Sequence, residues 1–230
     1  MSTIIKNNLK KGFITMNIDA KKMAGYCLIV GPIMALVSFF IQPGGILGIG
    51  GATPEPLDFA AAKKLAVDNS ALAIITGILV TMGLLKLLSG IVFYANSVMQ
   101  NGDGNGLGRV SLPFFIAAVI GWTIANGMNI ALAGEIYTDE NIIGVSFGIN
   151  IICSIAFGFG GIILALATSL RDEVNKNLSY LAAIAAAGVF VSNFVVAFSP
   201  DSGNTIQLVN GLCFIIYTIY SMAIGRSLIK

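Results

Sequence analysis

Long apolar runs alternate with short polar stretches along almost the whole chain. Each run reaches the length of about 20 residues that a helix needs to cross about 30 Å of hydrocarbon. Several runs are preceded by Asp, Asn or Ser, which favour helix N-termini. The pattern therefore predicts an all-α bundle of six transmembrane helices, possible as three successive hairpins. The helices are expected over residues 23–42, 70–96, 112–133, 142–168, 179–198 and 205–224.

The chain divides into two parts of different character. Residues 1–22 are polar and basic, with apolar residues spaced as on one helical face, which predicts a short helix on the membrane surface. Residues 23–230 hold the six predicted spans. The first span is long and no small-residue cleavage site follows it, so the N-terminal part does not resemble a cleaved signal peptide.

Composition supports a membrane protein and excludes several functions. Only 10% of the residues are charged and 56% are hydrophobic, against about 25% charged in soluble domains. The chain has no histidine, and its three cysteines lie singly inside apolar runs. Zinc, copper and haem sites depend heavily on these residues, so no metal or cofactor is expected. No basic stripe with aromatic residues suggests nucleic-acid binding.

The distribution of lysine and arginine predicts the orientation in the membrane. With the N-terminus inside, ten of the 13 basic residues fall in cytoplasmic segments and two, Lys63 and Lys64, fall outside. Cytoplasmic loops are enriched in these residues. We therefore expect both termini in the cytoplasm of a multi-pass protein, in a prokaryotic plasma membrane.

Two loops are rich in glycine. The first outer loop, residues 43–69, begins with an apolar glycine-rich stretch and holds a predicted short helix near residues 58–67. It is either a connector that lies on the membrane, or a re-entrant loop or lid over an outer cavity. The second, residues 101–108, lacks the strand context of a phosphate loop and the acids of a calcium loop, so we expect a flexible cytoplasmic linker.

Small residues mark expected helix contacts. Gly144 and Gly148 form a G-x-x-x-G pair, and Ala156 and Gly160 repeat the four-residue spacing. Such residues let helix backbones approach closely in a membrane. The fourth span is therefore predicted to pack in the middle of the bundle.

Asparagines form a layer in four of the predicted spans. When the direction of each helix is taken into account, all of them fall in the outer leaflet, about 5–10 Å from the membrane centre. Amides buried in hydrocarbon need hydrogen-bond partners. They either join the helices to one another or line an outward-facing polar cavity. The candidate binding residues are Asn126, Asn129, Asn150, Asn193 and Asn210.

Lys86 is a further candidate binding residue, because it lies near the middle of the second predicted span. A lysine there costs about 3 kcal/mol on insertion scales, and no predicted span contains Asp or Glu. Its amine either reaches the headgroups, bonds to carbonyls and hydroxyls such as Ser89, or meets an anion on another molecule.

These features favour a non-catalytic membrane protein that assembles with other membrane subunits or with itself in the lipid bilayer. Unpaired Lys86, the glycine faces and the absence of a predicted soluble domain support that function. The alternative is a small transporter or channel for a neutral or weakly polar solute, which the asparagine layer supports. An enzyme acting on lipid would need a nucleophile with a base or a carboxylate pair, and the spans provide neither.

Overall fold

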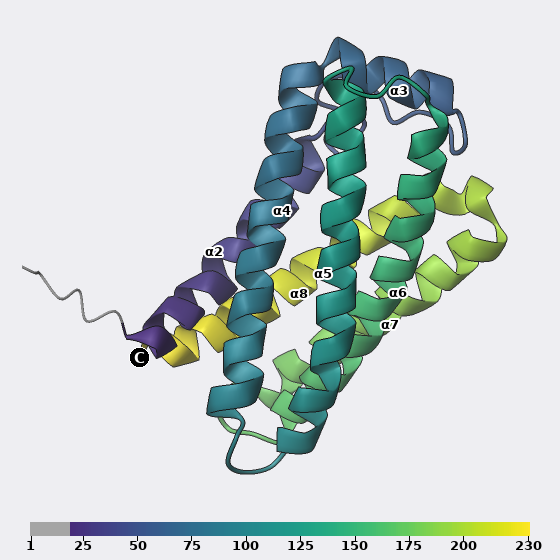
Figure 1. The fold of residues 1–230 in the computed structure, drawn as a ribbon. Helices are drawn as coiled ribbons and strands as arrows, with labels where there is room; N and C mark the ends of the chain where they lie inside the picture. The colour runs from purple at the N-terminus through teal and green to yellow at the C-terminus, as the bar shows by residue number, and fades with distance from the viewer. Residues whose placement is uncertain (1–18) are drawn as a thin grey trace, which may run out of the picture.

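The computed structural model describes residues 19–230, and the regular structure in that range is helical (Figure 1). Six helices are long and apolar enough to cross a membrane, so the predicted multi-pass, all-α architecture is confirmed. The predicted surface helix lies outside the described residues, apart from its last few positions. The six are α2 (Ala20–Ile41), α4 (Ser70–Phe93), α5 (Asn105–Ala133), α6 (Asn141–Ser169), α7 (Lys176–Phe198) and α8 (Gly203–Ile229).

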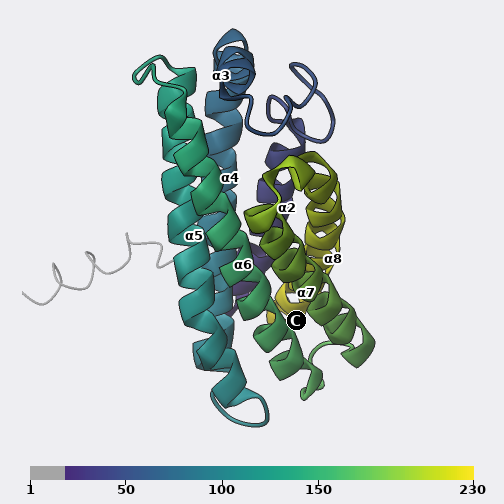
Figure 2. The ribbon, with the colours of Figure 1, turned by 90° about the vertical axis from the view of Figure 1, so that its right-hand side faces the viewer.

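Three short helices complete the described chain. The predicted helix of the first outer loop is present as α3 (Phe59–Asp68), which lies across one end of the bundle (Figures 1 and 2). A π-helix, η1 (Tyr94–Val98), continues α4, and a 3₁₀ turn, η2 (Pro200–Ser202), precedes α8. The second glycine-rich loop is shorter than expected, because α5 already begins at Asn105.

The six spans form a closed ring. Each packs against its two neighbours in the order α2, α4, α5, α6, α7, α8, and α8 packs back against α2. The end that carries α3 also carries the α5–α6 and α7–α8 connections. The other end carries the α4–α5 and α6–α7 loops, the start of α2 and the C-terminus (Figure 1). By the charge distribution the α3 end is predicted to face outside.

Helix α2 closes the ring through two glycine contacts. A Cβ on Gly83 of α4 would lie 2.7 Å from the carbonyl oxygen of Gly31 and 2.6 Å from the backbone nitrogen of Ala35. On its other side, a Cβ on Gly25 would lie 2.7 Å from the carbonyl oxygen of Gly225 in α8. Backbones approach this closely only where no side chain intervenes, and dispersion then supplies the attraction that lipid cannot.

Pro32 adds a hydrogen bond to the contact between α2 and α8. Proline has no N–H, so the carbonyl of Leu28 one turn earlier loses its helical donor. The hydroxyl of Ser221 in α8 donates to that carbonyl at 2.8 Å. A bond of this kind satisfies the freed backbone group inside the membrane.

The predicted contact face of the fourth span is partly wrong. Gly148 is not buried, and a Cβ there would meet nothing within 4 Å. Further along α6, Gly158 touches the backbone of Phe190 in α7, and Gly160 lies against Phe114 in α5. Because the spans form a ring, α6 is a wall between two neighbours and is not the centre of the bundle.

An ion pair and its hydrogen bonds join two loops at the end opposite α3. The Arg171 guanidinium donates to both carboxylate oxygens of Glu173 and to the carbonyls of Val98, Asn101 and Asp103. Its hydrogen bonds with Glu173 raise the pKa of Arg171 and lower the pKa of Glu173 from their usual values. The α6–α7 loop is thereby tied to the α4–α5 loop.

The orientation is tested by single-cysteine labelling in intact cells, in a background with the native cysteines replaced by alanine. We expect Asp201→Cys to react with a membrane-impermeant maleimide and Asn105→Cys to react only after the cells are opened, because basic residues are retained in the cytoplasm. Labelling of position 105 from outside, with none at position 201, would show that the orientation is reversed.

The glycine contact is tested by Gly83→Ala. The added methyl meets the backbone of α2, and overpacking of this kind typically costs about 1–3 kcal/mol. We expect a lower thermal unfolding midpoint for the purified protein in detergent. Gly148→Ala is the matched control, since its methyl enters open space. Equal midpoints for the two variants would contradict the close α2–α4 crossing.

Candidate functional site

A cavity of about 420 Å³ lies inside the ring, in the half of the bundle nearer α3. All six spans and the first outer loop contribute to its wall. Its size falls within the range of about 300–1,000 Å³ that is usual for small-molecule sites.

The polar part of the cavity wall consists largely of carboxamides. Among the described residues that line the cavity, none is Asp, Glu, Lys or Arg. Eight carry a side-chain amide, four carry a hydroxyl (Thr53, Ser154, Tyr217 and Thr218), and Trp122 carries an indole N–H. The amides belong to Gln42, Asn126, Asn129, Asn150, Asn193, Asn204, Gln207 and Asn210.

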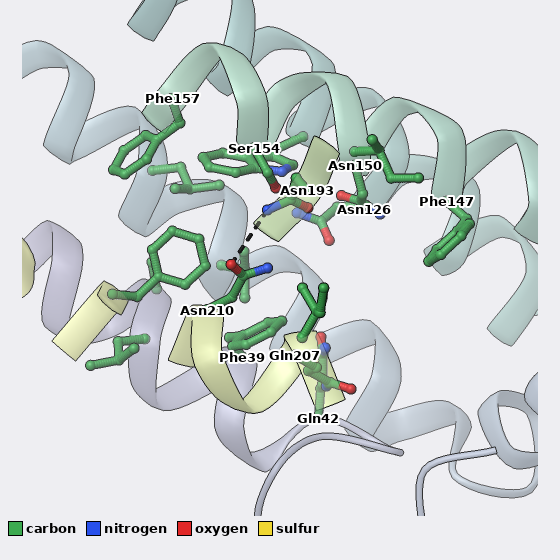
Figure 3. A pocket seen from close by; sticks show the side chains of 18 of the residues that line it. Phe39, Gln42, Asn126, Phe147, Asn150, Ser154, Phe157, Asn193, Gln207 and Asn210 are labelled. Atoms are coloured by element: carbon green, nitrogen blue, oxygen red, sulfur yellow. Dashed lines mark hydrogen bonds between the residues drawn. The ribbon is translucent and has the colours of Figure 1, made fainter. Parts of the chain in front are cut away.

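Two of these amides are held in place by their hydrogen bonds (Figure 3). Asn210 Oδ1 accepts from Ser192 Oγ at 2.8 Å and from Asn193 Nδ2 at 3.3 Å. Asn193 Nδ2 also donates to the carbonyl oxygen of Val189 at 2.8 Å. These bonds join α7 to α8 and fix which atom of each amide remains available to the cavity.

The other three predicted asparagines are less constrained. Asn126 Nδ2 lies 3.4 Å from Thr81 Oγ1, a long hydrogen bond between α5 and α4. Within the described chain the side chains of Asn150 and Asn129 make no hydrogen bond. Asn126 and Asn150 line the same cavity as Asn193 (Figure 3), so polar groups from three helices face the same space.

An aromatic cluster forms the floor of the cavity. Trp122, Phe157, Phe214 and Tyr217 contact one another with ring centroids 5.0–6.3 Å apart. These spacings are typical of favourable edge and tilted arrangements. The floor separates the amide layer from the half of the bundle predicted to face the cytoplasm.

Below the floor, buried hydroxyls join three helices. Thr168 Oγ1 lies 2.7 Å from the hydroxyl of Tyr220 and donates to Ser179 Oγ at 3.2 Å. All three residues are fully buried. This packing fills the bundle on the side of the floor away from α3.

The first outer loop lies over the α3 end of the cavity. Thr53 and Pro56 line the cavity, and the carbonyl of Pro54 accepts from Asn204 Nδ2 of α8 at 3.3 Å. Four of the loop's glycines have positive φ, among them Gly50 at 83°, a conformation that other residues rarely adopt. Of the two predicted roles, this placement supports the cover over a cavity.

Lys86 does not join the asparagines. It lies half-buried on α4 where that helix crosses α2, near Gly31, and is absent from the cavity wall. Within residues 19–230 its amine has neither a hydrogen bond nor an ion pair. The structure therefore brings the five predicted asparagines to one cavity and leaves Lys86 apart.

Several wall residues were not predicted from the sequence. Asn204 and Gln207 precede Asn210 at helical spacing toward the outer end of α8, which is the only signal that points to them. Gln42 ends the first span and looks like an ordinary interfacial residue. Trp122 packs against Phe157 within the bundle and also lines the cavity.

Comparisons with known proteins give no relative from which a function can be transferred. No protein-family model matches the chain, and neither a curated protein nor a solved structure matches it.

The single tryptophan of the chain gives a direct test of the cavity. In protein reconstituted in lipid nanodiscs, we expect neutral acrylamide to quench Trp122 fluorescence and iodide to quench it much less. A small neutral molecule can reach the cavity floor, whereas an anion finds no positive charge on the described wall to offset its loss of hydration. Equal quenching by both agents, or by neither, would contradict an accessible charge-free cavity.

Proposed function

We propose that this protein is a transporter or channel that binds a small neutral or weakly polar solute in the cavity and passes it across the membrane. The observation that carries the proposal is a cavity enclosed by all six spans, with eight amides and no charged side chain on its described wall.

The wall chemistry supports a neutral solute. Moving an ion out of water costs several kcal/mol unless an opposite charge compensates, and the described wall offers none. Carboxamides each present a donor and an acceptor, so they can replace the water around hydroxyl, amide or carbonyl groups. The aromatic floor adds apolar surface for the rest of the solute.

The asymmetry of the cavity supports a state in which the site lies toward the outer face, beneath the first outer loop. Amides concentrate toward the α3 end, while the aromatic floor and the Thr168–Tyr220 pair fill the other half. Passage to the cytoplasm then requires the floor to open, as in alternating access around a midplane site. No acid lies in the described spans to couple the movement to protons, so the proposed transport follows the solute gradient.

The proposed function is not catalytic. The cavity wall contains amides, hydroxyls and apolar groups, and none of its described members pairs a nucleophile with a base.

Lys86 favours a second candidate function, that of a subunit in a membrane complex. Its amine lies in an apolar helix without a partner in the described chain. A carboxylate on another membrane protein, or on a second copy of this chain, would offset the cost of burying the charge. The two functions are compatible, because Lys86 lies outside the cavity wall.

Transport is tested by stopped-flow light scattering on proteoliposomes exposed to urea, acetamide or glycerol. We expect at least one of these neutral solutes to enter faster than into protein-free liposomes, and potassium chloride to enter no faster. Asn150→Leu should reduce the rate about tenfold, the effect of losing one or two hydrogen bonds. Gly148→Ala, whose added methyl enters open space on α6, is the control. Rates equal to those of protein-free liposomes for every solute would rule out the proposed transport.

Assembly is tested by Lys86→Met, which keeps the length of the side chain and removes its charge. If Lys86 pairs with another subunit, the variant should insert normally but lose its partner on purification in mild detergent. If the amine reaches the headgroups, the variant should be as stable as the native protein or more so. Co-purification of native partners with the variant at native yield would remove the support for the subunit function.

A further inference from the structure

The hydrogen bonds of Asn193 and Asn210 leave a defined pair of groups for a ligand. The Oδ1 atom of Asn210 accepts from Asn193 at 3.3 Å and from Ser192 at 2.8 Å, which is shorter than the 3.1 Å from Ser192 to its other acceptor, the carbonyl of Val189. A carbonyl oxygen has two lone pairs, so this atom is fully used. What Asn210 can offer the cavity is its Nδ2 amino group, a donor.

The hydrogen bonds of Asn193 use its donor group and leave its acceptor for a ligand. Its Nδ2 group has two hydrogens, and these are directed to the carbonyl oxygen of Val189 at 2.8 Å and to Asn210 Oδ1 at 3.3 Å. Its Oδ1 atom accepts no hydrogen bond within the described chain, and the residue lines the cavity although it is 5% exposed. Asn193 therefore offers an acceptor beside the donor of Asn210.

An adjacent donor and acceptor are matched by a planar group that carries the same two functions in the opposite order. A primary carboxamide does this, with N–H to Asn193 and C=O to Asn210, as asparagine itself does when it reads the edge of adenine. A carboxylate has no hydrogen to donate to the Asn193 oxygen, and its negative charge would be repelled by that oxygen. An ester or a tertiary amide has no N–H, so it would leave that oxygen unpaired, which is costly in a buried site.

The surroundings of the pair extend this match. Asn126 directs its Nδ2 to Thr81, its Oδ1 atom accepts no hydrogen bond within the described chain, and it lines the same cavity as Asn193 (Figure 3). It can accept the second N–H of a primary amide. Toward the floor the wall becomes apolar, with Trp122, Phe157 and Phe214 in contact.

We infer that the cavity recognises a primary carboxamide on a compact apolar or aromatic body, with the amide at Asn193 and Asn210 and the body against the aromatic floor. This inference rests on the proposed solute-binding function and names the class of solute.

The experiment compares four probes of similar size: benzamide, N,N-dimethylbenzamide, methyl benzoate and benzoate. Each is titrated into the protein in nanodiscs, with Trp122 fluorescence as the readout and thermal stabilisation as a second measurement. We expect benzamide to bind about tenfold more tightly than the dimethyl amide or the ester, since both lack the N–H donors, and benzoate to bind most weakly.

The matched variants are Asn210→Asp and Asn129→Asp, which add the same charge to the same cavity. The carboxylate introduced by Asn210→Asp can still accept from Ser192 and Asn193, so the fold is preserved while the donor is lost. We expect Asn210→Asp to bind benzamide about tenfold more weakly than Asn129→Asp does. The Asn129→Asp variant keeps the hydrogen-bonded pair of Asn193 and Asn210 intact.

The outcomes separate this inference from the function on which it rests. If benzamide, the dimethyl amide and the ester bind equally, or if the two variants bind benzamide equally, the inferred recognition of a primary carboxamide is wrong. The proposed binding of a neutral solute would still stand. If no neutral probe binds and the liposomes also show no solute entry, both proposals are wrong. If solutes enter the liposomes but benzamide does not bind, only the inference fails.

Discussion

The close approach of α2 to its two neighbours is the contact on which the rest of the bundle depends. Without the glycines at the α2–α4 and α2–α8 crossings, α2 would be held away from both helices and the ring would not close. An open ring would expose amides of four spans to lipid, where unsatisfied polar groups cost several kcal/mol. Backbone packing along α2 thus makes the polar cavity possible.

Pro32 shows how local sequence and tertiary structure support each other here. The proline removes one helical hydrogen bond, and the serine of α8 that replaces it, Ser221, also ties α2 to the helix it must contact. Pro32 lines the cavity as well. The same residue therefore shapes the wall and fixes the position of the helix that carries it.

The spans and the short helix of the first outer loop were predictable, because hydrophobic runs of membrane length have few alternative structures. The gathering of the five predicted asparagines at one level of the bundle was also predictable, since the helical rise sets the level of each along its span. Ring closure was not: the Gly31–Gly83 and Gly25–Gly225 contacts join residues far apart in sequence, and single glycines outside a repeated spacing carry no local signal. The G-x-x-x-G pair at Gly144 and Gly148 was misleading for the same reason, because spacing alone does not show which face meets a neighbour.

The absence of charge on the described cavity wall has a consequence for the energetics of the membrane itself. A membrane stores about 2.3 kcal/mol for each elementary charge per 100 mV of potential, and any hydrated path that stabilised ions would release this energy. In this protein an ion entering the amide layer would exchange its hydration shell for neutral dipoles and then meet an aromatic floor. With such a wall, the proposed passage of uncharged solutes would leave the voltage of the cell intact.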